Sequence, residues 1–185
     1  MNLTPAPTCS NTKMYKPVLP YLIAVASLAC TSLLAQTGNG LDNPDWKEEA
    51  PPTPPVFSKD ALVKIDMPPH VSVAVGVDPN TIVVGPDGVV RYVVVMVNVS
   101  GSVNAMFEGI RCASDEVKTY ARWSTSGTWN VLTEPAWKGI NDNMPSKHAY
   151  AFARQGACDA RIASDKDTII RTLKSGKKPA AGTKL

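Results

Sequence analysis

The sequence predicts an α+β domain, in which an antiparallel β-sheet of about five to seven strands is packed by one or two short C-terminal helices. The first observation behind this prediction is a valine-rich run over residues 89–99, followed by a Ser-Gly-Ser turn and a second apolar run that ends at Cys112. β-branched side chains favour strands, and the lack of polar alternation in the first run predicts a strand covered on both faces. The second observation is the chain after residue 146, where an alanine-rich stretch and a capped segment replace the alternating pattern.

The strands before and after this central hairpin are predicted from alternation of apolar and polar residues, bounded by proline and glycine turns. The prolines at 68–69, the Asp-Pro-Asn turn at 78–80 and the Gly-Pro-Asp-Gly turn at 85–88 separate the early strands. We therefore expect strands over residues 61–66, 71–77, 81–84, 89–99, 103–112, 116–123 and 128–132.

Two short helices are predicted near the C-terminus. The first covers residues 147–154, which are rich in alanine. The second is expected to begin at Ser164 as the capping residue, with Asp165 and Asp167 in its first turn and Lys174 in its last. Gly176 is expected to end it, because glycine readily takes the left-handed conformation that closes a helix.

The N-terminal segment, residues 1–35, has the pattern of a secretory signal peptide. Lys13 and Lys16 precede an apolar run over residues 18–35 that ends in small residues. Translation could begin at Met14, which would leave a more compact leader. Cleavage after Ala35 is one alternative, and cleavage after residue 29 is the other. The second would place Cys30 first, as in a lipid-modified protein, and a retained membrane anchor is a further alternative.

Removal of the leader changes the charge and the cysteine count. Residues 36–185 carry 17 basic and 16 acidic side chains, so the net charge falls from +3 to +1. No basic stripe remains to bind nucleic acid, except in the tail 176–185, which is expected to be a solvated, disordered end. Residues 36–60 are a proline-rich lead-in with Trp46 as an anchor, and residues 61–175 form the single predicted domain.

Two cysteines, Cys112 and Cys158, certainly remain after processing. Cysteines of an exported protein face an oxidising compartment, so a disulfide between these two is predicted. They are 46 positions apart in the sequence, and a closed loop of this length stabilises a fold by about 4 kcal/mol in the chain-entropy account. The alternative, a catalytic thiol with His148 as its base, is much weaker.

Three charged residues on the two central strands are the best candidates for a ligand site: Arg91, Glu108 and Arg111. Glu108 shares the alternation of Met106 and Ile110, so it points towards the apolar side. A buried carboxylate needs partners, and Arg91 or Arg111 could supply a bidentate one. The first interpretation is a structural ion pair that fixes the hairpin register, and the second is a polar ligand pocket.

The remaining side chains indicate little chemistry. Metal ligation is not expected, because the two histidines are far apart and no metal-binding spacing occurs. No cofactor motif is found either. The aromatic residues could pack in the core or form a platform for a sugar or peptide; they are Trp123, Trp129, Trp137, Tyr92 and Tyr120.

Two segments in combination resemble a known family. Asp-Gly-Val-Val-Arg-Tyr at 87–92 and Glu-Gly-Ile-Arg-Cys at 108–112, with Trp129, Trp137 and Cys158, are similar to the cryptic neisserial protein-like family. These are small exported proteins of Gram-negative bacteria, some of them described as lipoproteins, with no assigned activity or catalytic residues. The resemblance covers residues 44–160 and implies a periplasmic or envelope location without a mechanism.

The sequence therefore favours a non-enzymatic exported protein that binds an envelope protein or a small ligand. One alternative is an envelope-directed enzyme that uses Glu108 as an acid or base. Another is a structural lipoprotein tethered through Cys30. Contact with the membrane is expected only where the protein is lipidated or keeps its leader, and no nucleic-acid partner is expected.

Overall fold

The computed structural model describes residues 43–142 and 146–176, and it confirms the predicted α+β fold. An eight-stranded sheet has the strand order β1-β2-β4-β5-β6-β7, with β3 also paired to β4 and β8 also paired to β6. All of its pairings are antiparallel. Its strands are β1 Val63–Lys64, β2 Ala74–Val77, β3 Val83–Val84, β4 Val89–Val97, β5 Val103–Arg111, β6 Glu116–Trp123, β7 Trp129–Val131 and β8 Lys138–Gly139.

The sheet has one strand more than the upper expectation, because Lys138–Gly139, which lies outside the predicted strands, pairs with the start of β6. A separate two-stranded sheet joins β9, Cys158–Asp159, to β10, Ile162–Ala163. Strand β4 is buried on both faces, as its valines predicted, since every residue from Val89 to Val95 is buried.

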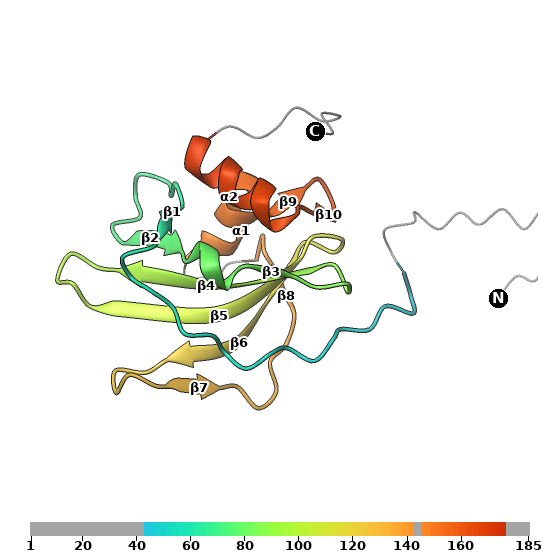
Figure 1. Ribbon diagram of the computed structural model, residues 1–185, viewed down its shortest axis with the longest axis horizontal. Coiled ribbons are helices and arrows are strands. Elements are labelled where there is room, and N and C mark those ends of the chain that lie inside the picture. Colours follow the sequence, from blue (N-terminus) through green and yellow to red (C-terminus); the bar gives the residue numbers. More distant parts are fainter. Residues whose placement is uncertain (1–42, 143–145, 177–185) are drawn as a thin grey trace, which may run out of the picture. The chain divides into compact units, whose positions relative to one another are not determined.

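The helices lie on one face of the sheet (Figure 1). They are α1, His148–Phe152, which continues into a π-helical turn η2, Ala153–Ala157, and α2, Lys166–Ser175. A short 3₁₀ turn, η1, covers Pro79–Thr81. The first helix was predicted over residues 147–154; its α-helical part is shorter, because the chain continues after Phe152 as the π-helical turn η2, in which Gly156 has a non-helical φ of 139°. Within the described residues, no helix is long and apolar enough to cross a membrane.

The predicted capping residue of the last helix was wrong by one position. The residue that caps α2 is Asp165, whose carboxylate accepts a hydrogen bond from the Thr168 N–H at 2.9 Å. That bond lowers the pKa of the Asp165 carboxyl. Ser164 instead donates its backbone N–H to Ala157. Gly176 ends the helix in the left-handed conformation, as predicted, with a φ of 63°.

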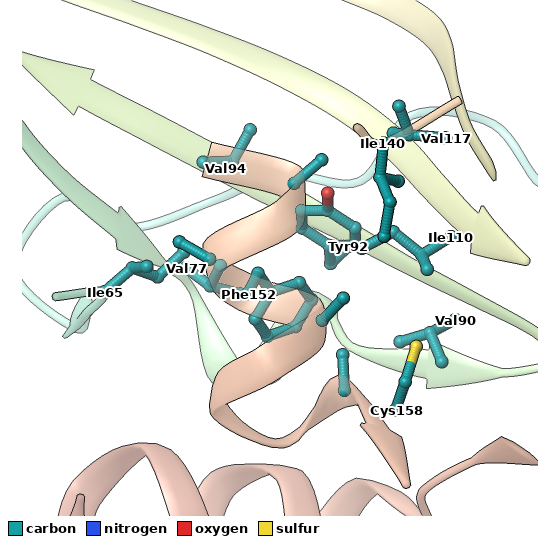
Figure 2. Packing of buried hydrophobic residues seen from close by; sticks show 14 of the residues in the cluster. Ile65, Val77, Val90, Tyr92, Val94, Ile110, Val117, Ile140, Phe152 and Cys158 are labelled. Carbon is teal, nitrogen blue, oxygen red and sulfur yellow. The ribbon is translucent and has the colours of Figure 1, made fainter. Parts of the chain in front are cut away.

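The larger core lies between the sheet and the helices (Figure 2). Tyr92 and Phe152 pack ring against ring, with centroids 4.4 Å apart, and Val77, Val94 and Ile110 surround them. The predicted disulfide is present at the edge of this core. Cys112 and Cys158 have Cα atoms 5.7 Å apart, within the range that an unstrained disulfide requires.

The opposite face of the sheet is covered by the described part of the proline-rich lead-in, residues 43–60, which we call the strap (Figure 1). The strap forms no strand of the sheet. Its Phe57 packs with a second apolar cluster that includes Val93, Val95 and Phe107. Because proline lacks an N–H donor, a proline-rich segment suits a cover that is fixed by side chains and carbonyl groups.

Candidate functional site

The three candidate residues do not come together, because they lie on opposite faces of the sheet. In the β4–β5 ladder, Tyr92 is opposite Glu108, whereas Arg91 is opposite Gly109 and Val89 is opposite Arg111. Side chains alternate between faces along a strand. Glu108 therefore faces the helices, while Arg91 and Arg111 face the strap. The expected ion pair between Glu108 and an arginine is wrong for this reason.

Glu108 is instead the centre of a buried polar network below α1. One carboxylate oxygen, Oε1, accepts a hydrogen bond from Thr119 Oγ1 at 3.0 Å. The other, Oε2, accepts one from the Tyr92 hydroxyl at 3.0 Å and lies 2.7 Å from His148 Nε2. His148 Nδ1 is in turn 2.7 Å from Ser146 Oγ. The carboxylate is 1 % exposed, so it meets the requirement that a buried charge be hydrogen-bonded.

The network has one clear electrostatic effect. Burial raises the pKa of the Tyr92 hydroxyl well above its usual value, and the negative charge of Glu108 raises it further. Tyr92 therefore stays protonated and acts as a hydrogen-bond donor. A register shift between Phe107 and Glu108 in the β5–β6 pairing places Thr119 opposite Glu108. This shift is what brings the Thr119 hydroxyl to the carboxylate.

Arg91 pairs with Asp87 under the strap. Its guanidinium nitrogens Nη1 and Nη2 donate to the two Asp87 carboxylate oxygens at 3.1 and 2.7 Å, and Nη2 also donates to the Glu49 carbonyl at 2.9 Å. Burial alone would raise the pKa of the Asp87 carboxyl, but the hydrogen bonds from Arg91 and from the Glu49 and Val89 N–H groups lower it overall. Both side chains are almost fully buried. Arg91 thus holds the strap in place.

Arg111 also contacts the strap. Its guanidinium carbon lies 3.7 Å from the centre of the Trp46 ring, a cation–π geometry. A second, weaker contact joins Arg111 Nη1 to Glu116 at 3.8 Å. Trp46 donates its indole N–H to the Asp87 carbonyl at 2.8 Å, which fits its predicted role as an anchor.

Glu48, the main polar residue of the strap, was not among the residues predicted from the sequence. Its carboxylate accepts hydrogen bonds from Lys118 Nζ at 2.6 Å, from the Tyr120 hydroxyl at 2.8 Å and from the Trp137 indole at 3.1 Å. Burial, together with the Glu48 carboxylate, raises the pKa of Tyr120. Two partners are 70 and 72 positions away in the sequence, and the indole is 89 away. Because they are so distant, no local pattern marks them.

These contacts give structural roles to residues of the two segments that carry the family resemblance, 87–92 and 108–112. In Asp87–Tyr92, the first residue pairs with Arg91 and the last donates to Glu108. In Glu108–Cys112, the glycine leaves room for a neighbouring ring, since a Cβ atom on Gly109 would lie 2.6 Å from the Tyr120 hydroxyl. The two segments pair directly in the β4–β5 ladder. Their residues serve the packing of both faces of the sheet.

The aromatic residues form separate groups instead of one. Trp123 packs edge-to-face against Trp129 and against Phe57 of the strap, with both centroid distances at 5.1 Å. Trp137 contacts Trp46 at 6.0 Å. Tyr92 lies in the core on the other face of the sheet.

The first aromatic group lines a hollow of about 290 Å³, which we call the aromatic groove. Lys59 is the charged residue on its wall. The groove is lined by Val56, Phe57, Lys59, Val103, Trp123 and Trp129.

Two further hollows adjoin the exposed side of α1 and share Tyr150 and Arg154. One, of about 330 Å³, lies between α1 and the segment that follows β1. The other, of about 240 Å³, lies near the disulfide. None of the three hollows is lined by Arg91, Glu108 or Arg111. Among the described residues, no group of three or more His, Cys, Asp or Glu side chains is placed to hold a metal ion.

Comparison with known proteins gives one result. The CNP1-like family model matches residues 41–174, which include the strap, the sheet and nearly all of the last helix. No curated protein and no solved structure matches the chain.

Proposed function

The chain belongs to the CNP1-like family, and we propose that it is a non-enzymatic binding domain of the bacterial envelope that holds a small apolar ligand in the aromatic groove. Export to the periplasm is supported by the leader pattern over residues 1–35. It is also supported by the disulfide between Cys112 and Cys158, since such bonds persist in oxidising compartments. Tethering through Cys30 is compatible with the same function.

The aromatic groove is the observation that carries this proposal. Its volume of about 290 Å³ is at the lower end of small-molecule sites and accommodates one ring or a short acyl segment. Its three aromatic rings meet edge-to-face or tilted, so they form a slot instead of the flat platform that a sugar ring stacks on. The Trp129 indole N–H is already bonded to the Pro55 carbonyl at 3.1 Å. Recognition therefore rests on apolar contact.

Lys59 selects the charge of the ligand. Among the residues that the structure describes, it is the one charged residue that lines the groove, and its side chain is exposed. An ammonium group at the rim favours an acidic group on the ligand. The ligand class is thus a small aromatic or acyl compound with a carboxylate or a similar acid.

Binding of 4-phenylbutyrate, with the alcohol 4-phenyl-1-butanol as the uncharged control, tests the proposal by isothermal titration calorimetry. We expect the acid to bind more tightly than the alcohol. Lys59→Gln should remove this preference, whereas Trp129→Ala should weaken the binding of both compounds. If neither compound binds, or if Trp129→Ala binds both as the parent does, the groove is not the binding site.

Export is tested separately by the intact mass of the protein isolated from the periplasmic fraction. We expect a chain that begins at residue 36, or at Cys30 with an added lipid. A cytoplasmic protein that retains residues 14–35 would contradict the proposed location without affecting the binding test.

A second candidate function rests on the Ser146–His148–Glu108 chain of hydrogen bonds. With the imidazole proton on Nε2, His148 donates to Glu108 and its Nδ1 accepts from the Ser146 hydroxyl. This is the order of groups that activates a serine for acyl transfer. It ranks second because His148 is 2 % exposed and lines none of the three hollows. Labelling by a fluorophosphonate probe that disappears in Ser146→Ala would promote this candidate, and absence of labelling would eliminate it.

A further inference from the structure

The hollow near the disulfide, which we call the polar hollow, is not used by the proposed function. Its floor is apolar and buried, and it is formed by Ile140, Ala153 and Cys158. Its rim is polar and exposed. Two rim residues, Tyr150 and Arg154, come from α1 and the π-helical turn that follows it.

Two further rim residues come from other segments: Asp115, in the turn between β5 and β6, and Asn141, which follows β8. The two charged residues form no ion pair with each other. Within the described part of the chain, the side chains of Asp115, Asn141, Tyr150 and Arg154 make no hydrogen bond or ion pair at all. One positive and one negative side chain therefore line the same hollow above an apolar floor, and both are available to a ligand.

The walls of the polar hollow are joined by contacts between segments that are distant in sequence. The disulfide links Cys112 to Cys158, and the Ile140 N–H donates to the Asp115 carbonyl at 2.9 Å. Arg161 Nε donates to a carbonyl of the β5–β6 turn at 2.6 Å. These contacts fix the backbone segments that carry the rim, so that only the rim side chains lose conformational freedom when a ligand binds.

The backbone at this place is also unusual. Within the described residues, the non-glycine residues with positive φ are Asp115, at 55°, and Ala160, at 51°, and both line the polar hollow. This conformation is unfavourable for alanine by roughly 1–2 kcal/mol. Such residues gather where the surrounding structure holds the chain in a required shape, which is common at binding sites.

We propose that the polar hollow binds a small zwitterion of the amino-acid type. The carboxylate of the ligand contacts the Arg154 guanidinium and the Tyr150 hydroxyl on the helical wall. The ammonium group contacts the Asp115 carboxylate and the Asn141 side-chain carbonyl at the rim. A short apolar side chain lies on the buried floor. Arginine is suited to the first role, because its planar donors match a carboxylate.

The chemistry differs from that of the aromatic groove. The groove offers one positive charge and a large apolar surface, so it selects an acid. The polar hollow offers one charge of each sign and a small floor, so it selects a molecule that is neutral overall but carries both charges. A compound with one charge leaves the opposite charged residue without a partner and binds less tightly.

Three probes of similar size test the zwitterion requirement: L-alanine, propionate and ethylamine. Binding to the processed, oxidised protein is followed through the backbone amide shifts of Ala153 and Ala160 in nuclear magnetic resonance titrations. We expect L-alanine to bind with a dissociation constant of about 1 mM and each singly charged probe to bind at least about tenfold more weakly. Binding of propionate or ethylamine as tightly as L-alanine would overturn the zwitterion proposal.

Two variants of exposed rim residues test the site itself. Arg154→Gln and Asp115→Asn should each weaken L-alanine binding at least about tenfold without lowering the melting temperature. Asparagine also adopts positive φ readily, so the second change keeps the backbone of the turn. Arg171→Gln, on the exposed surface of α2, is the matched control and should bind as the parent does. If the parent shows no shifts at tens of millimolar L-alanine, or if both rim variants bind as the parent does, the proposal fails.

Discussion

Replacing Glu108 with glutamine would measure how much the buried network stabilises the fold. Glutamine has the same shape. Its carbonyl oxygen can replace Oε2 and accept from Tyr92 and His148, and its amide can replace Oε1 and donate to the Thr119 hydroxyl. No hydrogen bond is lost, but each loses the contribution of the negative charge.

The magnitude follows from these three contacts. A hydrogen bond to a charged group contributes about 1.5–3 kcal/mol to stability, and a neutral one contributes about 0.5–1.5 kcal/mol. Three such differences sum to about 3–4.5 kcal/mol, and the removal of a buried charge offsets part of this sum. We therefore expect Glu108→Gln to lower the free energy of unfolding by about 1–3 kcal/mol.

Equilibrium unfolding in urea, with the disulfide intact, measures this difference. The matched control is Glu116→Gln on the neighbouring strand. Glu116 is 31 % exposed and its contact with Arg111 is 3.8 Å long, so the change should cost less than about 1 kcal/mol. A Glu108→Gln protein as stable as the parent would refute the reasoning. The stabilisation by the three charged hydrogen bonds would then only equal the cost of burying the Glu108 carboxylate.

Three further predictions concern other parts of the fold. Cys112 and Cys158 should resist thiol labelling under denaturing, non-reducing conditions, and changing both to alanine should lower stability by roughly 2–5 kcal/mol; ready labelling of both would contradict the disulfide. Asp87→Asn leaves a buried guanidinium without its countercharge and should destabilise by about 3–5 kcal/mol at pH 7. The pKa of Asp87 is lower in the folded protein, so its pairing stabilises at neutral pH and is lost as the pH falls below about 4. The difference between parent and variant in urea titrations should therefore shrink there, and a constant difference would argue against the ion pair. Asp165→Ala should cost about 1 kcal/mol as the loss of a helix cap, whereas Ser164→Ala should change little; the reverse order in thermal unfolding would return the cap to Ser164.

The sequence predicted the elements that depend on local pattern. The valines of β4 required burial on both faces, and the alternation around Glu108 correctly placed it on an apolar side. The disulfide was predicted from the number of cysteines that remain outside the predicted leader. Each of these predictions uses residues close together in the chain or a count of residue types.

The residues that contact Glu108 are determined by the register between β4 and β5. This register cannot be predicted from the apolar–polar pattern of one strand alone. A hairpin centred on Ser100 pairs Tyr92 with Glu108 and puts Arg91 on the other face. The turn residues at 100–102 could have predicted this pairing, since the turn sets the register of a hairpin. His148 and Glu48 could not be found in this way, because they reach the sheet from segments that are 40 or more positions away.

The strap also constrains the order in which this chain can fold. It is synthesised before every strand, yet Trp46, Glu48 and Pro55 bind to residues that follow them by 41 to 89 positions. Loop closure over such distances is slow and gains nothing until the far residues are present. A chain that leaves the ribosome or crosses a membrane from its N-terminus therefore cannot complete the docking of its strap until Trp137 has emerged. During this interval the face that contains Val93, Val95 and Phe107 is uncovered, and it is the surface at which a chaperone would act.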